Sequence, residues 1–201
     1  MVQVTDTGSS GTMEKEGLRR CLNKVPNEFN LNVGTLANDR HKQISAFLRA
    51  DYPNINHQFD IGHVSKSVTK KLTKEGIKNS LLPWIQSISN HLWWSAQSCN
   101  LNPDVLVAKW ISIVHHVVNV HSWQDRHFQS CEHGPLDDAQ CRKKWLKPNG
   151  RAHLALKNVV LNNALLRDIP KLSSFCHTGM LEVFHSLLTK YCPKRQHFSF
   201  M

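Results

Sequence analysis

The sequence predicts an α/β fold interrupted by a large, all-helical segment. Short apolar runs alternate with helix-like stretches up to residue 79, which is typical of strands paired in parallel. Residues 80–170 carry helical apolar spacing throughout and contain all six tryptophans, which favours a subdomain with its own small core. We therefore expect a partial α/β core over 1–79, a helical insertion over 80–170 and a closing helix of the core within 171–201.

Three short apolar runs predict the strands. They lie, in chain order, at residues 2–5, 31–37 and 55–61. The second run ends at Asn38-Asp39, and the third places Ile55, His57, Phe59 and Ile61 on one face. Parallel pairing is expected for the later strands because a helix-like stretch separates them.

Helical spacing of apolar residues predicts the helices between and after these strands. The expected ranges are 13–25, 40–49, 64–78, 81–98, 105–121, 152–166 and 179–191. We expect Pro26-Asn27 to stop the first helix. In the third, Val64, Val68 and Leu72 should face inward and the lysines outward. In the last, apolar residues including Leu181, Phe184, Leu187, Leu188 and Tyr191 are available for packing.

The composition indicates a globular, basic protein. The chain has 201 residues and a formal net charge of +10, which favours polyanions such as nucleic acid as partners, although a basic surface is also common in proteins without such a partner. No apolar run is long enough to span a membrane, and the first residues lack a signal-peptide pattern. Six scattered cysteines without a secretory signal are expected to be reduced, in the nucleus or cytoplasm.

Three carboxylates are placed as in a metal-dependent nuclease. Asp39 and Asp60 end predicted strands, and Glu182 lies on the closing helix. Two-metal phosphoryl transfer needs carboxylates from separate elements that converge on the ions. Each residue has an ordinary alternative: Asp39 and Asp60 can cap the helices that follow them, and Glu182 can be a solvent-facing helix residue.

Four segments of the chain carry a resemblance to a known family. They are residues 33–78, Asn90-His-Leu-Trp-Trp94, Lys143-Lys-Trp-Leu-Lys-Pro148 and Leu181-Glu-Val-Phe-His-Ser186. Together they resemble the DDE transposases of eukaryotic cut-and-paste DNA elements, in the group with Kolobok-like, P-element-like, Mutator-like and hAT-like enzymes. The resemblance implies an RNase H-like fold and DNA strand cleavage and transfer with Mg²⁺ or Mn²⁺.

The resemblance also assigns roles to individual residues. Asp39 matches the second catalytic Asp and Glu182 the catalytic Glu, so both are expected as metal ligands. Asp60 and His63 match the supporting Asp-x-x-His motif, although Gly62 stands where an aromatic residue is expected. His63 can pair with a carboxylate near the metal or simply hold the strand-to-helix turn.

One part of the family pattern has no counterpart in this sequence. No candidate for the first catalytic Asp precedes the strand at 2–5, so we expect an N-terminally truncated catalytic domain, without the family's zinc-containing DNA-binding domain and inactive. The intact family uses Mg²⁺ or Mn²⁺, and the absence of a bound cation is the alternative for this fragment. The alternative is a non-catalytic basic module that binds DNA or protein, and a homo-oligomer is compatible with either.

Lysines near the proposed catalytic elements are the candidates for DNA contact. They are Lys66, Lys70, Lys71, Lys143, Lys144 and Lys147. A solvated helix face is the alternative for the first three. Trp94 or Trp145 can stack on an unpaired base, or belong to the core of the insertion. We expect neither a membrane nor a small-molecule substrate as a partner.

Histidines and cysteines in the insertion suggest a zinc site, but their spacing fits no standard one. The residues are His115, His116, His121, Cys131, His133 and Cys141. The alternative is that these side chains are packed or exposed without a metal, and the spacing favours it.

Overall fold

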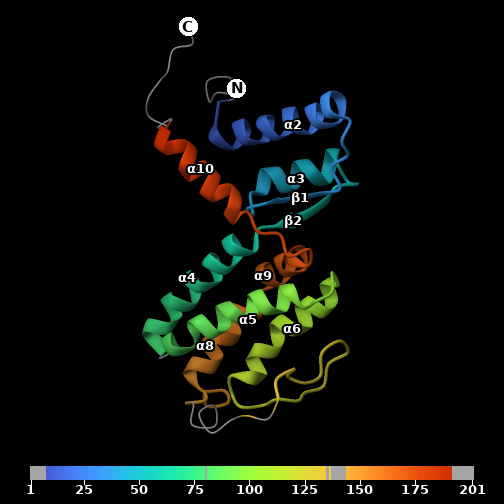
Figure 1. The fold of residues 1–201 in the computed structure, drawn as a ribbon. Coiled ribbons are helices and arrows are strands. Elements are labelled where there is room, and N and C mark those ends of the chain that lie inside the picture. The colour runs from blue at the N-terminus through green and yellow to red at the C-terminus, as the bar shows by residue number, and fades with distance from the viewer. Residues whose placement is uncertain (1–7, 80, 135, 137–143, 192–201) are drawn as a thin grey trace.

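The computed structural model describes residues 8–79, 81–134, 136 and 144–191 (Figure 1). The strand expected at 2–5 lies outside them. The described chain is a mixed α/β structure that is mostly helical, with one two-stranded parallel sheet. Its elements, in chain order, are α2 (Ser10–Phe29), β1 (Thr35–Asn38), α3 (Lys42–Asp51), β2 (Asn56–Phe59), α4 (Ile61–Asn79), η1 (Leu82–Trp84), α5 (Ile85–Gln97), α6 (Pro103–His116), α8 (Arg151–Val160), α9 (Asn163–Asp168), η2 (Ile169–Leu172) and α10 (Gly179–Tyr191).

The two strands lie side by side with α3 as their connection. They pair in parallel, with Thr35 opposite Asn56 and Asn38 opposite Phe59, which confirms the expected orientation. Helices α2 and α3 share a small core in which the side chains of Leu22, Phe47 and Leu48 are buried. We call α2, β1, α3 and β2 the α/β lobe.

Helix α2 is longer than the sequence predicts. Pro26 was expected to end it, but the helix continues to Phe29, so that prediction is wrong. Pro26 lies in the last turns, where its missing N–H removes one helical hydrogen bond. The left-handed Asn30 then closes the helix, because its N–H donates to the Pro26 carbonyl. Ser9 caps the other end, since its hydroxyl accepts from the Thr12 N–H.

Helices α4, α5, α6 and α8, with α9 and η2, form a second unit that we call the helical bundle (Figure 1). The inward face predicted for α4 is confirmed, because Val64, Val68 and Leu72 are at most 1% exposed. The tryptophans largely follow the core interpretation. Trp84 and Trp110 are buried, and the Trp110 indole donates to the Val160 carbonyl.

The helix predicted at 152–166 is two helices, α8 and α9. Asn162 lies between the two helices and caps the second, because its side-chain oxygen accepts from the N–H groups of Ala164 and Leu165. The side chain therefore starts a new helix where apolar spacing alone predicts continuation.

Helix α10 has the predicted bounds, but its apolar residues are exposed. None of its described side chains is buried, and Phe184 and Leu187 are 53% and 50% exposed. The helix extends away from the bundle towards the start of α2 (Figure 1). Its apolar residues are available for packing, as the sequence indicates, but they pack against no core in the part of the chain that the structure describes.

The segment 168–178 runs between the lobe and the bundle. The guanidinium of Arg40 pairs with Asp168 (3.0 Å), and the Gln58 side-chain oxygen accepts from the Ser174 N–H (3.2 Å). The Cys176 carbonyl accepts from the Ile61 N–H at the start of α4. This segment thereby fixes the ends of β1 and β2 relative to α10.

Candidate functional site

Three residues far apart in the sequence meet where the strands end. Asp39 follows β1, His63 is in the first turn of α4, and Glu182 is in the first turn of α10. His63 Nε2 lies 3.1 Å from Glu182 Oε1, and His63 Nδ1 lies 3.9 Å from Asp39 Oδ2. We call this group the Asp39–His63–Glu182 cluster. It contains both carboxylates that the sequence predicts as metal ligands and the histidine of the supporting motif.

The cluster is open to solvent. The side chains of Asp39, His63 and Glu182 are 70%, 39% and 51% exposed, so a cation or a phosphate can reach all of them. Carboxylate oxygens are the ligands that Mg²⁺ and Mn²⁺ prefer, and these two fit that requirement chemically. Each carboxylate faces a different nitrogen of the His63 ring. A cation held by both would therefore have to take over the contacts that the imidazole now makes.

Asp60 has a structural role in this site. It is 2% exposed, and its Oδ1 accepts from the His63 N–H at 2.8 Å, which caps α4. Its Oδ2 accepts from both the N–H and the hydroxyl of Thr178, just before α10. Burial acts to raise the pKa of Asp60, but the hydrogen bonds from Thr178 and His63 outweigh it and hold the pKa below its usual range.

Helix capping was the alternative role for both Asp60 and Asp39, and the structure separates the two residues on this point. The capping interpretation holds for Asp60. It does not hold for Asp39, because the cap of α3 is His41, whose ring Nδ1 accepts from the Ile44 N–H. The Asp39 side chain is left facing His63.

Gly62, within the Asp-x-x-His sequence, lies where there is little room for a side chain. A Cβ on Gly62 would lie 3.0 Å from Asp60 Oδ1 and 3.3 Å from the His177 ring. The His177 ring in turn packs edge-on against Trp93 at 5.2 Å. An aromatic residue at position 62 would therefore collide with the His177 ring as it lies here.

A groove with two of the predicted DNA-contacting lysines adjoins the cluster. It has a volume of about 480 Å³ and is lined by residues that include Lys66, Lys70, Trp93 and Glu182. Lys66 Nζ lies 3.8 Å from Glu182 Oε2. Lys66, Lys70 and Lys71 are all exposed, as predicted. A polyanion in this groove would therefore contact the Lys66 ammonium beside the Glu182 carboxylate.

The other predicted lysines lie elsewhere. Lys144 and Lys147 are exposed, but the segment 144–150 lies at the end of the bundle farthest from α10 (Figure 1). The predicted contact Lys143 is outside the described residues. The structure therefore does not place Lys144 and Lys147 beside the cluster. Trp94 packs under the Lys109 ammonium at 4.6 Å and Trp145 against Trp84 at 5.7 Å, so both have partners within the insertion.

Sequence reasoning missed the residues that brace the strand ends. His57 on β2 accepts from Lys171 at Nδ1 (3.1 Å), which leaves Nε2 to donate to Asn38 (2.8 Å) beside Asp39. Burial, with the positive charges of Lys171 and Arg49, lowers the pKa of His57 to about 4. Nothing in the spacing connects these residues. Thr178 is different, because a threonine immediately before a predicted helix is a recognisable capping signal.

The structure also assembles four of the histidines and cysteines in the insertion. The ligand atoms of His116, His121, Cys131 and His133 all lie within 4.8 Å of one another. His115 is not part of this group, because its ring stacks on Trp123 at 5.2 Å. The expected Cys141 is outside the described residues.

Comparison with known proteins assigns no family or function to this chain. No protein-family model, curated protein or solved structure matches this chain. Within the described residues, no helix is long and apolar enough to cross a membrane.

Proposed function

We propose that this chain derives from the catalytic domain of a DDE transposase and binds DNA at the Asp39–His63–Glu182 cluster with the help of a divalent cation. The observation that supports this most is the meeting of Asp39, His63 and Glu182 at one point, because they come from three separate elements. The resemblance selected these positions from sequence alone. Random surface residues rarely match both an ordered motif and a common location.

The α/β lobe supports the same origin at the level of fold. We propose that β1, α3 and β2 correspond to part of an RNase H-like core. In support, the two strands are parallel, and Asp39 immediately follows β1. Residues 80–170 would then be the helical insertion that precedes the catalytic Glu in this group.

The expected activity is binding without efficient cleavage. The intact family uses three acidic ligands, and among the described residues two carboxylates face the His63 ring. When bound, Mg²⁺ or Mn²⁺ would supply positive charge for a DNA phosphate. Asp39 and Glu182 would hold the cation, His63 would orient them, and Lys66 and Lys70 would bind neighbouring phosphates in the groove.

Cation-dependent DNA binding tests this proposal. We expect the fluorescence anisotropy of a labelled duplex to show tighter binding with Mn²⁺ than with EDTA for the wild-type chain. The double variant Asp39→Asn/Glu182→Gln should lose the difference. Glu28→Gln, which removes an exposed carboxylate of α2, is the matched control and should keep it. The proposed site is wrong if the double variant and the control respond alike to Mn²⁺.

A cleavage assay tests the expected inactivity. A single-turnover nicking assay with Mg²⁺ or Mn²⁺ should show no product above background. Clear nicking that disappears in Asp39→Asn would show instead that the cluster is an active nuclease centre.

The exposed lysines of α4 favour a second candidate, a non-catalytic basic binding module. Lys66, Lys70 and Lys71 can track a phosphate backbone without any metal. In that case DNA binding would be indifferent to Mn²⁺ and to Asp39→Asn. DNA binding would still weaken as the salt concentration rises. In the variant with all three lysines changed to Gln, the slope of log binding constant against log salt concentration should become shallower by up to about 0.9 per lost phosphate contact.

A further inference from the structure

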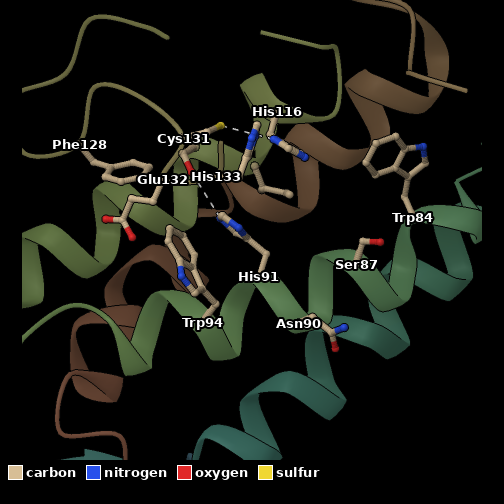
Figure 2. A pocket seen from close by; sticks show the side chains of 12 residues that line it. Trp84, Ser87, Asn90, His91, Trp94, His116, Phe128, Cys131, Glu132 and His133 are labelled. Carbon is tan, nitrogen blue, oxygen red and sulfur yellow. Dashed lines mark hydrogen bonds between the residues drawn. The ribbon is translucent and has the colours of Figure 1, made fainter. Parts of the chain in front are cut away.

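We propose that His116, His121, Cys131 and His133 form a structural zinc site within the helical insertion. We call these residues the His₃Cys cluster. The proposal is independent of the one for Asp39 and Glu182, which lie in a different part of the molecule. Three of the four ligands, His116, Cys131 and His133, converge at one side of the pocket shown in Figure 2.

Two of the six distances between the ligand atoms are already close to those of a tetrahedral zinc site. Zinc bonds of 2.0–2.1 Å to nitrogen and 2.3 Å to sulfur require ligand atoms about 3.3–3.6 Å apart. His116 Nδ1 lies 3.4 Å from Cys131 Sγ, and His133 Nε2 lies 3.1 Å from His121 Nδ1. All four ligand atoms fall within 4.8 Å of one another, so small side-chain movements suffice to enclose an ion.

The outer nitrogens of two histidines are bonded as metal ligands require. His121 Nε2 donates to the Asn119 side-chain oxygen at 2.9 Å, and His133 Nδ1 donates to the Gly134 carbonyl at 2.7 Å. Both acceptors are oxygens without a proton, so each ring carries its hydrogen on the outside. Neutral rings then turn two unprotonated nitrogens, His121 Nδ1 and His133 Nε2, towards each other. A cation between them relieves the repulsion of their lone pairs.

The backbone brings these ligands together from a short stretch of chain. His116 ends α6, and the chain then turns back on itself through a bridge between Ser122 and Ser130. Within this turn the Cys131 N–H donates to the His121 carbonyl at 2.9 Å, which sets the two ligands opposite each other. This hairpin explains how a ligand spacing that fits no standard pattern still yields a compact site.

The ligand set indicates a structural ion. Four protein ligands fill a tetrahedral zinc, which leaves no position for a substrate or water. The rings of His116 and His121 also pack edge-on against Trp145, at 5.6 and 5.7 Å. An ion here would join the end of α6 to the hairpin, and the two rings that pack on Trp145 would link that site to the segment before α8.

Zinc content is the first test. The purified full chain should contain about one zinc per molecule by elemental analysis, as a closed four-ligand site requires. Cys131→Ser and His133→Asn should lose most of it. The matched controls are Cys21→Ser and His127→Asn, an exposed cysteine of α2 and an exposed histidine of the same hairpin, and both should retain it.

Cobalt substitution reads the geometry directly and does not depend on folding of the variants. Wild-type chain stripped with a chelator and titrated with Co²⁺ should develop the visible absorption of a tetrahedral site and one thiolate-to-cobalt charge-transfer band. The bands should saturate at one Co²⁺ per chain and be displaced by Zn²⁺. A pale octahedral spectrum without the charge-transfer band would overturn the proposal.

The hydrogen bond from His121 to the Asn119 side chain provides a finer test. Asn119 has a left-handed backbone (φ 62°), which glycine adopts without strain, so Asn119→Gly removes the side-chain acceptor and leaves the turn intact. We expect zinc affinity to fall about 10-fold or more. Asn119→Asp keeps an oxygen acceptor and should restore it. Equal affinity in all three chains, or zinc loss in the two control variants, would contradict the assigned ligands.

Discussion

In the helical bundle, the side chains of Leu92, Leu106 and Leu156 are fully buried, whereas in the core of the α/β lobe only Leu48 comes close, at 1% exposed. Helices of the bundle bury their apolar faces against one another. The lobe has two strands of four residues each, and a pair of strands is marginally stable without further packing. The lobe therefore depends on the segment 168–178, which ties it to the bundle.

The comparison predicts different consequences for two similar core substitutions. Leu156→Ala in α8 should lower the free energy of unfolding by about 2–5 kcal/mol, because it leaves a cavity in the larger core. Leu48→Ala in α3 should act locally. Hydrogen exchange should speed up in α2, α3 and the strands for Leu48→Ala, and across the whole chain for Leu156→Ala.

Equal protection patterns in the two variants would show that lobe and bundle unfold as one unit. The two-region description would then be wrong. Global denaturation of both variants in urea, followed by circular dichroism, provides the accompanying stability measurement.

Substitution of the two aspartates at the strand ends should change the free energy of unfolding by different amounts. Asp60→Asn removes a buried charge that caps α4 and holds Thr178, so we expect a loss of about 2 kcal/mol. Asp39→Asn should change stability by less than about 0.5 kcal/mol, because its pair with His63 is exposed. Urea unfolding measures both. A large loss for Asp39→Asn would mean that this residue serves the fold rather than a ligand.

Acid should weaken the link between lobe and bundle through His57. Burial lowers its pKa from the usual 6.5 to about 4, so between these values the unfolded chain binds a proton that the folded chain does not. The stabilisation from neutral His57 is complete above pH 6.5 and is lost as pH falls towards 4. After allowance for partial exposure we expect a loss of about 1 kcal/mol.

His57→Gln isolates this contribution. The variant should show a shallower fall in unfolding free energy between pH 7 and pH 4.5 than the wild type, measured in urea at each pH. Other histidines whose pKa is lowered by burial, such as His91, are present in both chains and cancel in the difference. Parallel pH profiles for variant and wild type would rule out His57 as the titrating group.

The features that the sequence predicts well depend on local periodicity. The inward face of α4 repeats at helical spacing, and a helix between two strands favours their parallel pairing, so both were predicted. The break at Asn162 depends on the side-chain hydrogen bonds that start α9, and α2 continues past Pro26 to a cap at Asn30. Apolar spacing does not record such bonds, and both were mispredicted.

The candidate sites show the same limit. The resemblance placed Asp39, His63 and Glu182 in one site, but only the structure separates the exposed Asp39 from the buried, capping Asp60. The His₃Cys cluster was weighed as a zinc site and disfavoured for its spacing. That spacing becomes meaningful only when the hairpin through Ser122 and Ser130 is known, and hairpin pairing is a tertiary property of the chain.

Helix α10 should give the smallest effect and the clearest contrast with the bundle. Phe184→Glu and Leu187→Glu replace apolar side chains that are half exposed, and we expect the free energy of unfolding to change by no more than about 0.5 kcal/mol. The same substitution at Leu92 of α5, which is fully buried, should abolish folding because a carboxylate cannot be solvated there. A loss of several kcal/mol at Phe184 would show that α10 packs against a core in solution, and that the apolar residues available on this helix are used there.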